Sequence, residues 1–419
     1  MAALRRYMRL IIGILGIVAC LFLMQATARI GFSRLLAKYA LLENSLPAAD
    51  EAVRLSPSDP ETHHARATVL SRLQMPAEAV ASLDAATSLR SRDDLLWLEL
   101  GNAREEVGDT QGALAALDQA VRWAPHYAHT HWQRGNLLLR MGRLDEAFAE
   151  LREAAAANRN YLPNLIDLAW GISRGDIKTT ENLVRIKDDS ERLALIRFLA
   201  RKGKGKETLE EIRLLHGSLS TDTKNELARL LFAAKSFRDA FDVWRTGDQK
   251  PALFNGGFEE QLVLSDAGFG GWILSPDQTK SKLAIDVSQK FAGTKSLQIT
   301  FDGNWTPGAP LLSQTFVVEP SKTYRVTFSL KTKDLVTGGP PIFTVNDATT
   351  NQLLGQSENF PSTGSWSKLS FDFTTLATSE AAVIRLQRNN CEPAPCPIFG
   401  VVWLDEITIE PGQSAHSQR

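Results

Sequence analysis

A repeat of 34 residues in the first half of the chain limits its fold more than any other feature. Three sets of positions recur at this interval: Ala79, Ala113 and Ala147; Leu83, Leu117 and Leu151; and Ala86, Ala120 and Ala154. A fixed period of this length indicates stacked units, because one such unit cannot bury its apolar face alone. The pattern therefore predicts an array of similar helical units.

The unit from Asp94 to Tyr127 shows the repeat most completely. Its landmarks are Trp97, Leu100, Gly101, Gly108, Ala113, Leu117, Ala120 and Pro125. This order resembles the tetratricopeptide repeat (TPR), although Arg104 stands where that family usually has an aromatic residue. The resemblance implies two antiparallel helices per unit, and a concave surface that would bind a protein partner.

The array is expected to extend beyond its clearest units. Ala52 and Pro57 keep the register of the repeat, which predicts a degenerate first unit. Past Tyr161, apolar residues at helical spacing recur at residues 165–169, 193–196, 227–231 and 240–244. We therefore expect TPR and TPR-like helical repeats over residues 31–250.

The first residues have the pattern of a membrane segment. Arg5, Arg6 and Arg9 precede an apolar run over residues 10–28. At 1.5 Å per residue this run forms a helix of roughly 28 Å, close to the thickness of a hydrocarbon core. Residues 1–30 are therefore expected to be a membrane anchor or signal segment.

This segment could be an uncleaved membrane anchor, a cleaved signal peptide or a lipoprotein signal. Ala26-Thr27-Ala28 has the form of a signal-peptidase site, and Ile17-Val18-Ala19-Cys20 resembles a bacterial lipoprotein box. Because Cys20 is followed by four apolar residues, and because the run is long, an uncleaved single-pass anchor is favoured. All three fates predict an inner-membrane or exported protein, with the bulk of the chain in the periplasm.

Charge and motif patterns exclude several function classes. Lys and Arg total 47 against 48 Asp and Glu, so the chain lacks the basic excess of a protein that coats nucleic acid. Gly171-Ile172-Ser173-Arg174-Gly175 matches the text of a nucleophile elbow, but its neighbours are helical in pattern. His63 and His131 occupy equivalent repeat positions and lack metal-ligand spacing. We expect no catalytic residues, and no enzyme.

From Leu253 the apolar periodicity changes from 3.6 to 2. The segments over residues 323–330 and 367–374 alternate, and turn residues such as Gly338-Gly339-Pro340 separate the strand candidates. This pattern predicts an antiparallel β-sandwich, or jelly roll, over residues 251–412, with a flexible tail over residues 413–419. The fold class is thus multidomain α plus β.

The order of landmarks in this half is informative. They are Asn255-Gly256-Gly257-Phe258-Glu259, Gly271-Trp272, Gly293 to Leu297, Glu319-Pro320, Gly364-Ser365-Trp366 and Trp403 to Ile407. This order is similar to that of jelly-roll carbohydrate-binding modules of the family 4/9/22 type. The resemblance implies a polysaccharide or glycan partner, and a structural calcium at Glu259 and Asp405. Carboxylates that cap loop amides are the alternative for these two residues.

Sugar binding requires an aromatic face and polar groups for hydroxyls. Trp305 lies in the expected loop Asp302-Gly303-Asn304-Trp305, so it is the leading stacking candidate, and burial under that loop or at the junction with the helical repeats is the alternative. Arg385 and Gln387 share one strand face, and together with Gln314 they are candidate hydroxyl contacts.

A short cysteine pair completes the candidate sites. Cys391 and Cys396 flank Glu-Pro-Ala-Pro, which suits a local disulfide in an oxidising compartment. No cofactor is required. We expect a membrane-anchored scaffold of exopolysaccharide or cell-envelope assembly, because this domain combination resembles proteins of polysaccharide export. The alternative is a protein-interaction scaffold whose β-sandwich binds no sugar.

Overall fold

The structure is a computed structural model that describes residues 2–245, 253–260, 271–274, 281–303, 305–391 and 396–412, with side chains from residue 13 onward. It divides into two compact units, residues 1–187 and residues 188–419. The predicted boundary at residue 250 and the predicted flexible tail at residues 413–419 lie outside the described residues. The two units are described separately.

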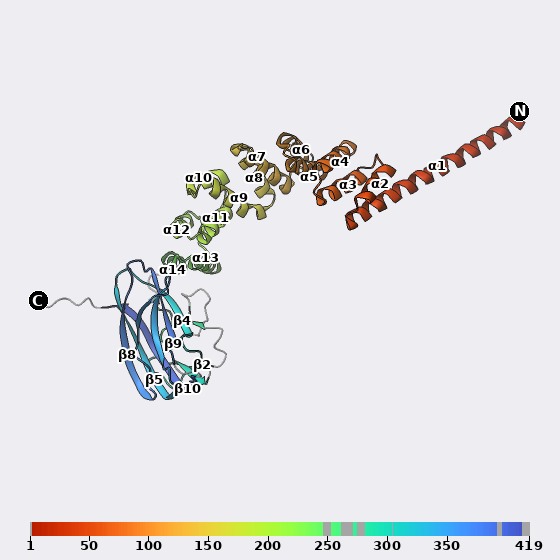
Figure 1. Ribbon diagram of the computed structural model, residues 1–419. Helices are drawn as coiled ribbons and strands as arrows, with labels where there is room; N and C mark the ends of the chain where they lie inside the picture. Colours follow the sequence, from red (N-terminus) through yellow and green to blue (C-terminus); the bar gives the residue numbers. More distant parts are fainter. Residues whose placement is uncertain are drawn as a thin grey trace. The chain divides into compact units, whose positions relative to one another are not determined.

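Unit 1 consists of helices that pair along the chain (Figure 1). Their bounds are α1 Ala2–Glu43, α2 Leu46–Leu55, α3 Pro60–Arg72, α4 Pro76–Leu89, α5 Asp94–Glu106, α6 Thr110–Trp123, α7 Ala128–Arg140, α8 Leu144–Ala157, α9 Leu162–Ile172 and α10 Ile177–Val184. Each odd-numbered helix packs against the even-numbered helix that follows it. The predicted array of helix pairs is thereby confirmed.

Close approach of the helices within a pair explains the repeated glycine. A Cβ atom added to Gly101 would lie 2.8 Å from Leu117 Cγ, and one added to Gly135 would lie 2.7 Å from Leu151 Cγ. The small residue in the first helix therefore makes room for the leucine of the second. This contact recurs because both residues recur at the repeat interval.

Helix α1 belongs both to the apolar segment and to the repeats. It runs unbroken through residue 30, and its last residues pack against α2 and α3. Ala37, Ala52 and Ala65 form a small buried cluster there, which gives the expected degenerate first unit. Among the described residues, one helix, Gly13–Glu43, is long and apolar enough to cross a membrane, although a signal sequence would fit equally well.

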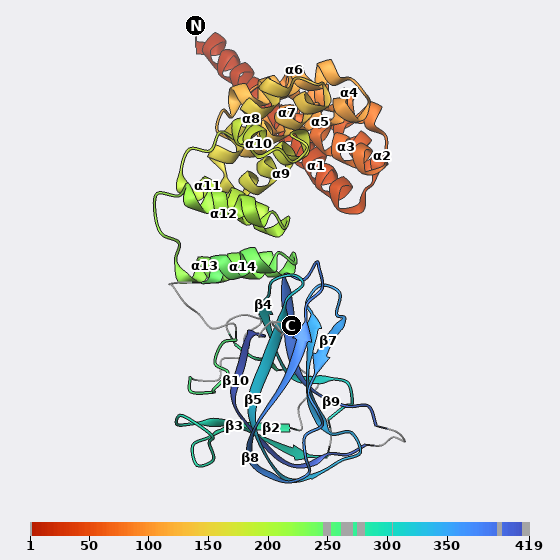
Figure 2. The same ribbon diagram turned by 90° about the vertical axis from the view of Figure 1, so that its left-hand side faces the viewer.

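Unit 2 begins with two further helix pairs. They are α11 Asp189–Arg201, α12 Gly205–Arg213, α13 Thr221–Ala233 and α14 Phe237–Trp244. Helix α14 contacts strand β4 of the sandwich, and Figures 1 and 2 show the α13–α14 pair beside one end of it. Packing therefore joins these last helices to the β-sandwich.

The rest of unit 2 is a sandwich of two antiparallel five-stranded sheets, ordered β1-β4-β9-β6-β7 and β2-β3-β10-β5-β8 (Figure 2). The strands are β1 Ile273–Leu274, β2 Ser281–Asp286, β3 Ser296–Asp302, β4 Pro310–Val317, β5 Thr323–Val336, β6 Pro341–Asp347, β7 Leu353–Gln356, β8 Gly364–Thr374, β9 Ala381–Arg388 and β10 Phe399–Pro411. The core between the sheets is apolar and aromatic, and the predicted β-sandwich is confirmed.

Candidate functional site

Strand alternation separates the candidate glycan contacts onto two faces of one sheet. Gln314 of β4 lies opposite Ile384 of β9, which belongs to the core. Its neighbour Ser313 lies opposite Arg385. Because successive side chains point to opposite faces of a sheet, Gln314 faces the core and Arg385 faces outward. These two residues therefore cannot contact the same ligand.

Gln314 has a structural role inside the sandwich. Its side chain is fully buried, and its amide group donates to the carbonyl of Phe254 at 3.0 Å. The same side chain accepts a hydrogen bond from Phe254 N at 2.6 Å. Both polar atoms are thus used to hold the segment that precedes the first strand.

Trp305 is also buried, which matches the alternative of burial under its loop and does not match stacking on a sugar from an exposed loop. Only 3% of its surface is exposed, and its ring lies parallel to Phe301 with centroids 5.4 Å apart. Its Nε1 donates to Ala309 O at 3.0 Å, which satisfies the ring within its own loop. The buried guanidinium of Arg388 donates to the Trp305 carbonyl and fixes this loop over the end of the core.

Arg385 is the predicted residue that faces an open space. Its Nη1 donates to Asn351 Oδ1 at 2.7 Å, which is the one hydrogen bond of its side chain within the described part of the chain. Burial lowers the pKa of Arg385 from its usual value, although an arginine stays charged at any physiological pH. Most of its N–H donors therefore remain available to a ligand.

A cavity of about 460 Å³ adjoins Arg385 on this outer face. We call it the outer-face cavity, and its lining residues are Phe232, Phe237, Ile273, Pro310, Ser313, Thr315, Ala348, Asn351, Val383 and Arg385. The two phenylalanines come from α13 and α14, so helices and sheet line it together. Gln387 shares the strand face of Arg385 but does not line the cavity.

Two buried polar atoms occupy the same face of the sheet. Thr344 lies directly opposite Arg385, and Asn346 lies opposite Val383. Thr344 Oγ1 and Asn346 Oδ1 are buried without a hydrogen-bond partner among the described residues, and neither residue lines the outer-face cavity. Such atoms are costly unless a ligand or water satisfies them. These two residues could not be identified from the sequence, because their proximity to Arg385 depends on strand register.

The two carboxylates of the expected calcium site cap a loop. Asp405 Oδ2 accepts from Phe291 N at 2.9 Å and from Ala292 N at 3.1 Å. Glu259 accepts from Thr294 N at 2.7 Å and also from the Thr294 hydroxyl. These bonds lower the pKa of Glu259, whereas burial raises that of Asp405.

The contacts thus match the capping alternative for both carboxylates. Among the described residues, no cluster of three or more His, Cys, Asp or Glu side chains could hold a metal ion. The structural calcium at Glu259 and Asp405 therefore stays a prediction, and no function below depends on it.

The remaining candidate positions have structural roles. Cys391 and Cys396 form a disulfide, with Cα atoms 6.1 Å apart. Ser173 of the elbow-like motif lies after α9, where its hydroxyl bonds Trp170 O, and Asp176 then caps α10 through Thr179 N. No strand precedes this serine, so the geometry of a nucleophile elbow is absent from this described segment.

Comparison with known families finds a matching family for a segment of the β-sandwich half and for a segment of the helical half. A carbohydrate binding domain family matches residues 250–394, and a tetratricopeptide repeat family matches residues 106–168. The predicted family resemblances are therefore confirmed for these segments.

Individual proteins share less with the chain. Protein FlbA of Caulobacter vibrioides is 29% identical over 98 residues, which cover 23% of this chain and 16% of FlbA. The chain therefore matches less than a fifth of this curated relative. MamA of Desulfovibrio magneticus RS-1 is 20% identical over 37% of this chain and 90% of its own, with a TM-score of 0.33. A CBM4 structure is 16% identical over 38% of this chain and 98% of its own, with a TM-score of 0.29.

Proposed function

Because the chain carries tetratricopeptide repeats and a β-sandwich of the carbohydrate-binding-domain type, we propose that it is a non-catalytic, membrane-anchored scaffold. The concave face of the repeats binds a protein partner, and the outer-face cavity binds a glycan. Both segment types are usually non-catalytic, which supports a scaffold over an enzyme.

The polar groups around the outer-face cavity are the observation that carries the glycan proposal. Arg385 offers N–H donors, and Ser313 and Asn351 line the cavity beside it with further polar groups. Sugar hydroxyls both donate and accept, so they match this set. The cavity volume of about 460 Å³ is within the usual range for small-ligand sites, and Phe232 supplies an apolar surface.

The cellular role that fits these parts is exopolysaccharide or cell-envelope assembly at the inner membrane. The apolar helix supports anchoring, with the bulk of the chain in the periplasm. The disulfide between Cys391 and Cys396 supports an oxidising compartment on that side. In this arrangement the repeats hold an assembly protein while the sandwich contacts the polysaccharide.

Replacement of one arginine tests the glycan site. The probe is a polysaccharide that the unmodified full-length protein retains from a broad glycan panel. We expect the Arg385→Ala variant to bind it at least tenfold more weakly in a pull-down, since charge-assisted hydrogen bonds contribute about 1.5–3 kcal/mol. Arg325→Ala is the matched control, because Arg325 pairs with Asp372 on the other sheet. Equal loss in both variants, or none in Arg385→Ala, would contradict the site.

A scaffold whose β-sandwich binds no sugar is the second candidate. The burial of Trp305 favours it, because the loop then offers no exposed tryptophan for a pyranose ring. If the unmodified protein retains no polysaccharide from a broad glycan panel, this second function replaces the first. The proposed role of the repeats would be unaffected.

A further inference from the structure

Helix α1 has an exposed apolar stripe just beyond the proposed membrane segment. The stripe, called the α1 stripe below, consists of Phe32, Leu35, Tyr39 and Leu42, which are 54%, 61%, 53% and 80% exposed. Their spacing of three, four and three residues is that of the a and d positions of a coiled coil. Large apolar side chains at consecutive seam positions rarely face water without a partner.

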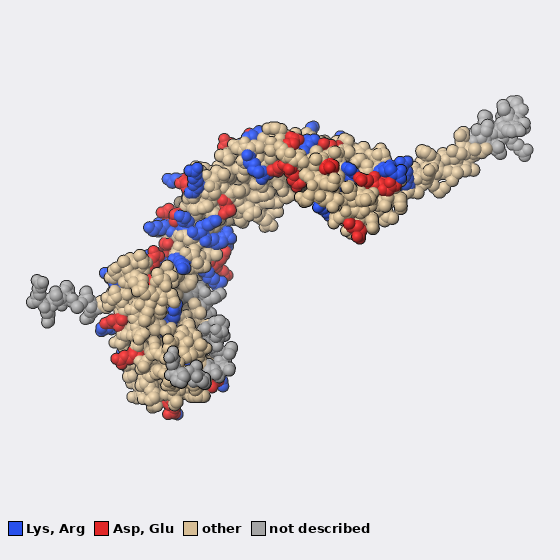
Figure 3. Space-filling view, viewed as in Figure 1, with Lys and Arg blue, Asp and Glu red and all other residues tan. Residues whose placement is uncertain are grey.

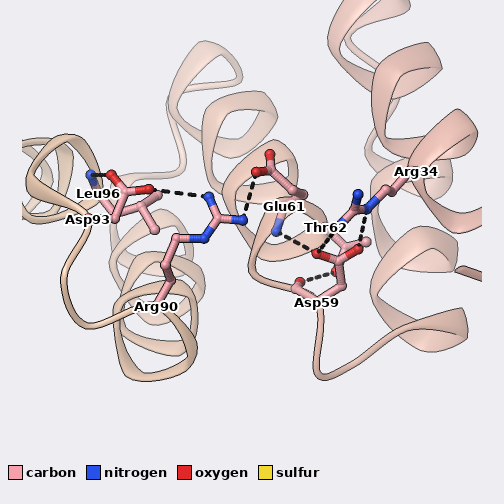
Figure 4. A network of polar contacts seen from close by, with 7 residues as sticks. All are labelled: Arg34, Asp59, Glu61, Thr62, Arg90, Asp93 and Leu96. Atoms are coloured by element: carbon pink, nitrogen blue, oxygen red, sulfur yellow. Dashed lines mark hydrogen bonds and ion pairs between the residues drawn. The ribbon is translucent and has the colours of Figure 1, made fainter.

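The opposite side of the same helix faces the repeats. Ser33, Ala37 and Ala40 are buried against α2 and α3. Arg34 Nε donates to Asp59 at the start of α3 at 2.8 Å, which fixes the rotation of α1 (Figure 4). In the same network Arg90 bridges Glu61 and Asp93, so the first helix pairs are tied together. The α1 stripe therefore cannot turn inward and cover itself.

The seam continues upstream into the apolar segment. The same heptad places Ala28, Gln25, Leu21, Val18 and Ile14 at the preceding a and d positions. Figure 3 shows no basic or acidic side chain on this part of α1 in its view. Gln25 is the one polar residue of this seam, and its amide can both donate to and accept from an identical amide.

Charges flank the α1 stripe in a complementary order. Lys38 and Glu43 occupy the g and e positions beside it, and both are exposed. Neither has an ion-pair partner within the described part of the chain. In a parallel two-stranded coiled coil, a g residue faces the e residue five positions later in the other strand. Lys38 of one chain would therefore face Glu43 of a second, identical chain, twice per pair.

We propose that the α1 stripe is a homodimer interface, at which two copies of this chain form a parallel coiled coil from the apolar segment to Glu43. This inference rests on the proposed membrane anchoring, because two copies inserted through the same segment enter the bilayer parallel and at equal depth. Their stripes then face each other in register around a twofold axis. The seam exposed beyond the membrane is about 15 Å long, from the helical rise of 1.5 Å per residue.

Cysteine crosslinking in membranes tests this interface. In full-length protein carrying Cys20→Ser, we expect Leu35→Cys or Leu42→Cys to form a disulfide-linked dimer with copper phenanthroline. Leu144→Cys is the matched control, because Leu144 is also an exposed leucine of unit 1 but lies on α8. A dimer no more abundant than in this control, or a crosslink to a protein of different mass, would overturn the proposal.

Charge reversal provides a second measurement that needs no disulfide at the seam. Lys38→Glu should weaken self-association about fivefold, because two attractive pairs become repulsive. Lys38→Glu combined with Glu43→Lys should restore it, whereas an interface that only touches lipid would show no such restoration. Carbonate extraction of the same membranes tests the anchoring. A chain that carbonate releases into the soluble fraction would contradict the membrane proposal. Crosslinking of that soluble fraction would then show whether the dimer forms without a membrane.

Discussion

One hydrogen bond recurs in three repeats, at positions 34 residues apart. The ring nitrogens His63 Nε2, Trp97 Nε1 and His131 Nε2 lie 2.8, 2.8 and 2.9 Å from the carbonyls of Pro57, Ser91 and Pro125, respectively. Each carbonyl belongs to the turn six residues earlier. Because tryptophan and histidine both offer a ring N–H, either can hold this turn. The histidines at these positions therefore hold a turn of the repeat in place.

His131 differs from His63 in having acceptors on both ring nitrogens. Its Nδ1 lies 2.7 Å from Glu150 Oε2 while Nε2 faces the Pro125 carbonyl. A ring between two acceptors is best satisfied as the doubly protonated imidazolium. The hydrogen bond to Glu150 accordingly raises the pKa of His131, and burial only partly opposes this.

The stability of unit 1 should therefore depend on pH through His131. Because the folded-state pKa is raised, the extra stability is complete below about pH 6.5 and is lost as pH rises through the folded pKa. We expect His131→Gln to remove about 1–2 kcal/mol at pH 6 and much less at pH 9, measured by denaturant unfolding. His63→Gln, which loses only the carbonyl contact, is the control. If the loss of unfolding free energy depended on pH in the same way for both variants, the proposed role of His131 would be contradicted.

Single residues of the site were only partly predictable. Arg385 was identified because its strand alternates clearly, and the structure does place it beside a cavity. For Trp305 the alternative of burial holds, because its loop folds back over Phe301. Gln314 is grouped with Arg385 as a candidate hydroxyl contact, although strand register places the two side chains on opposite faces of the sheet. It instead hydrogen-bonds Phe254 within the core.

At the scale of elements, the helix pairs follow directly from the repeat. A fixed spacing of small and large residues specifies which helices approach closely, so the array was predictable from the sequence. The sandwich was predictable in type, because alternation marks strands. The order of the strands in the sheet was not predictable. Strand β9 pairs with β4 and β6, and both of these strands lie far before β9 in the sequence. The outer-face cavity depends on that order.

The helix-pair contact yields a prediction about two glycines. Gly135→Val should destabilise unit 1 by about 1–3 kcal/mol, since overpacking forces Leu151 and the Ala147 carbonyl to move. Gly171→Val is the matched control, because nothing lies within 4 Å of an added Cβ there. Thermal melting followed by circular dichroism measures both. Similar melting temperatures for the two variants would show that α7 and α8 are not closely packed.

At the scale of the whole molecule, helical periodicity and packing divide the chain at different places. Helical spacing continues to Trp244, yet the helices after residue 187 belong to the same compact unit as the β-sandwich, which α14 contacts. Phe237, Ala240 and Val243 of α14 form a cluster with Ala381 of β9. The change of periodicity near residue 250 could not reveal this, because it marks a change of secondary structure and carries no information about contacts.

Unit 2 should therefore be more stable with its helices than without them. A fragment of residues 188–412 should melt about 5–10 °C above residues 253–412, because the shorter fragment exposes Ala381 and loses the bond from Arg238 Nη2 to Val318 O at 2.8 Å. Within the longer fragment, Arg238→Ala should lower the melting temperature. Arg229→Ala on the neighbouring helix should leave it unchanged, since Arg229 is exposed. Equal melting of the two fragments would mean that the helices and the sandwich fold independently, and the phenylalanine side of the outer-face cavity would then lose its support.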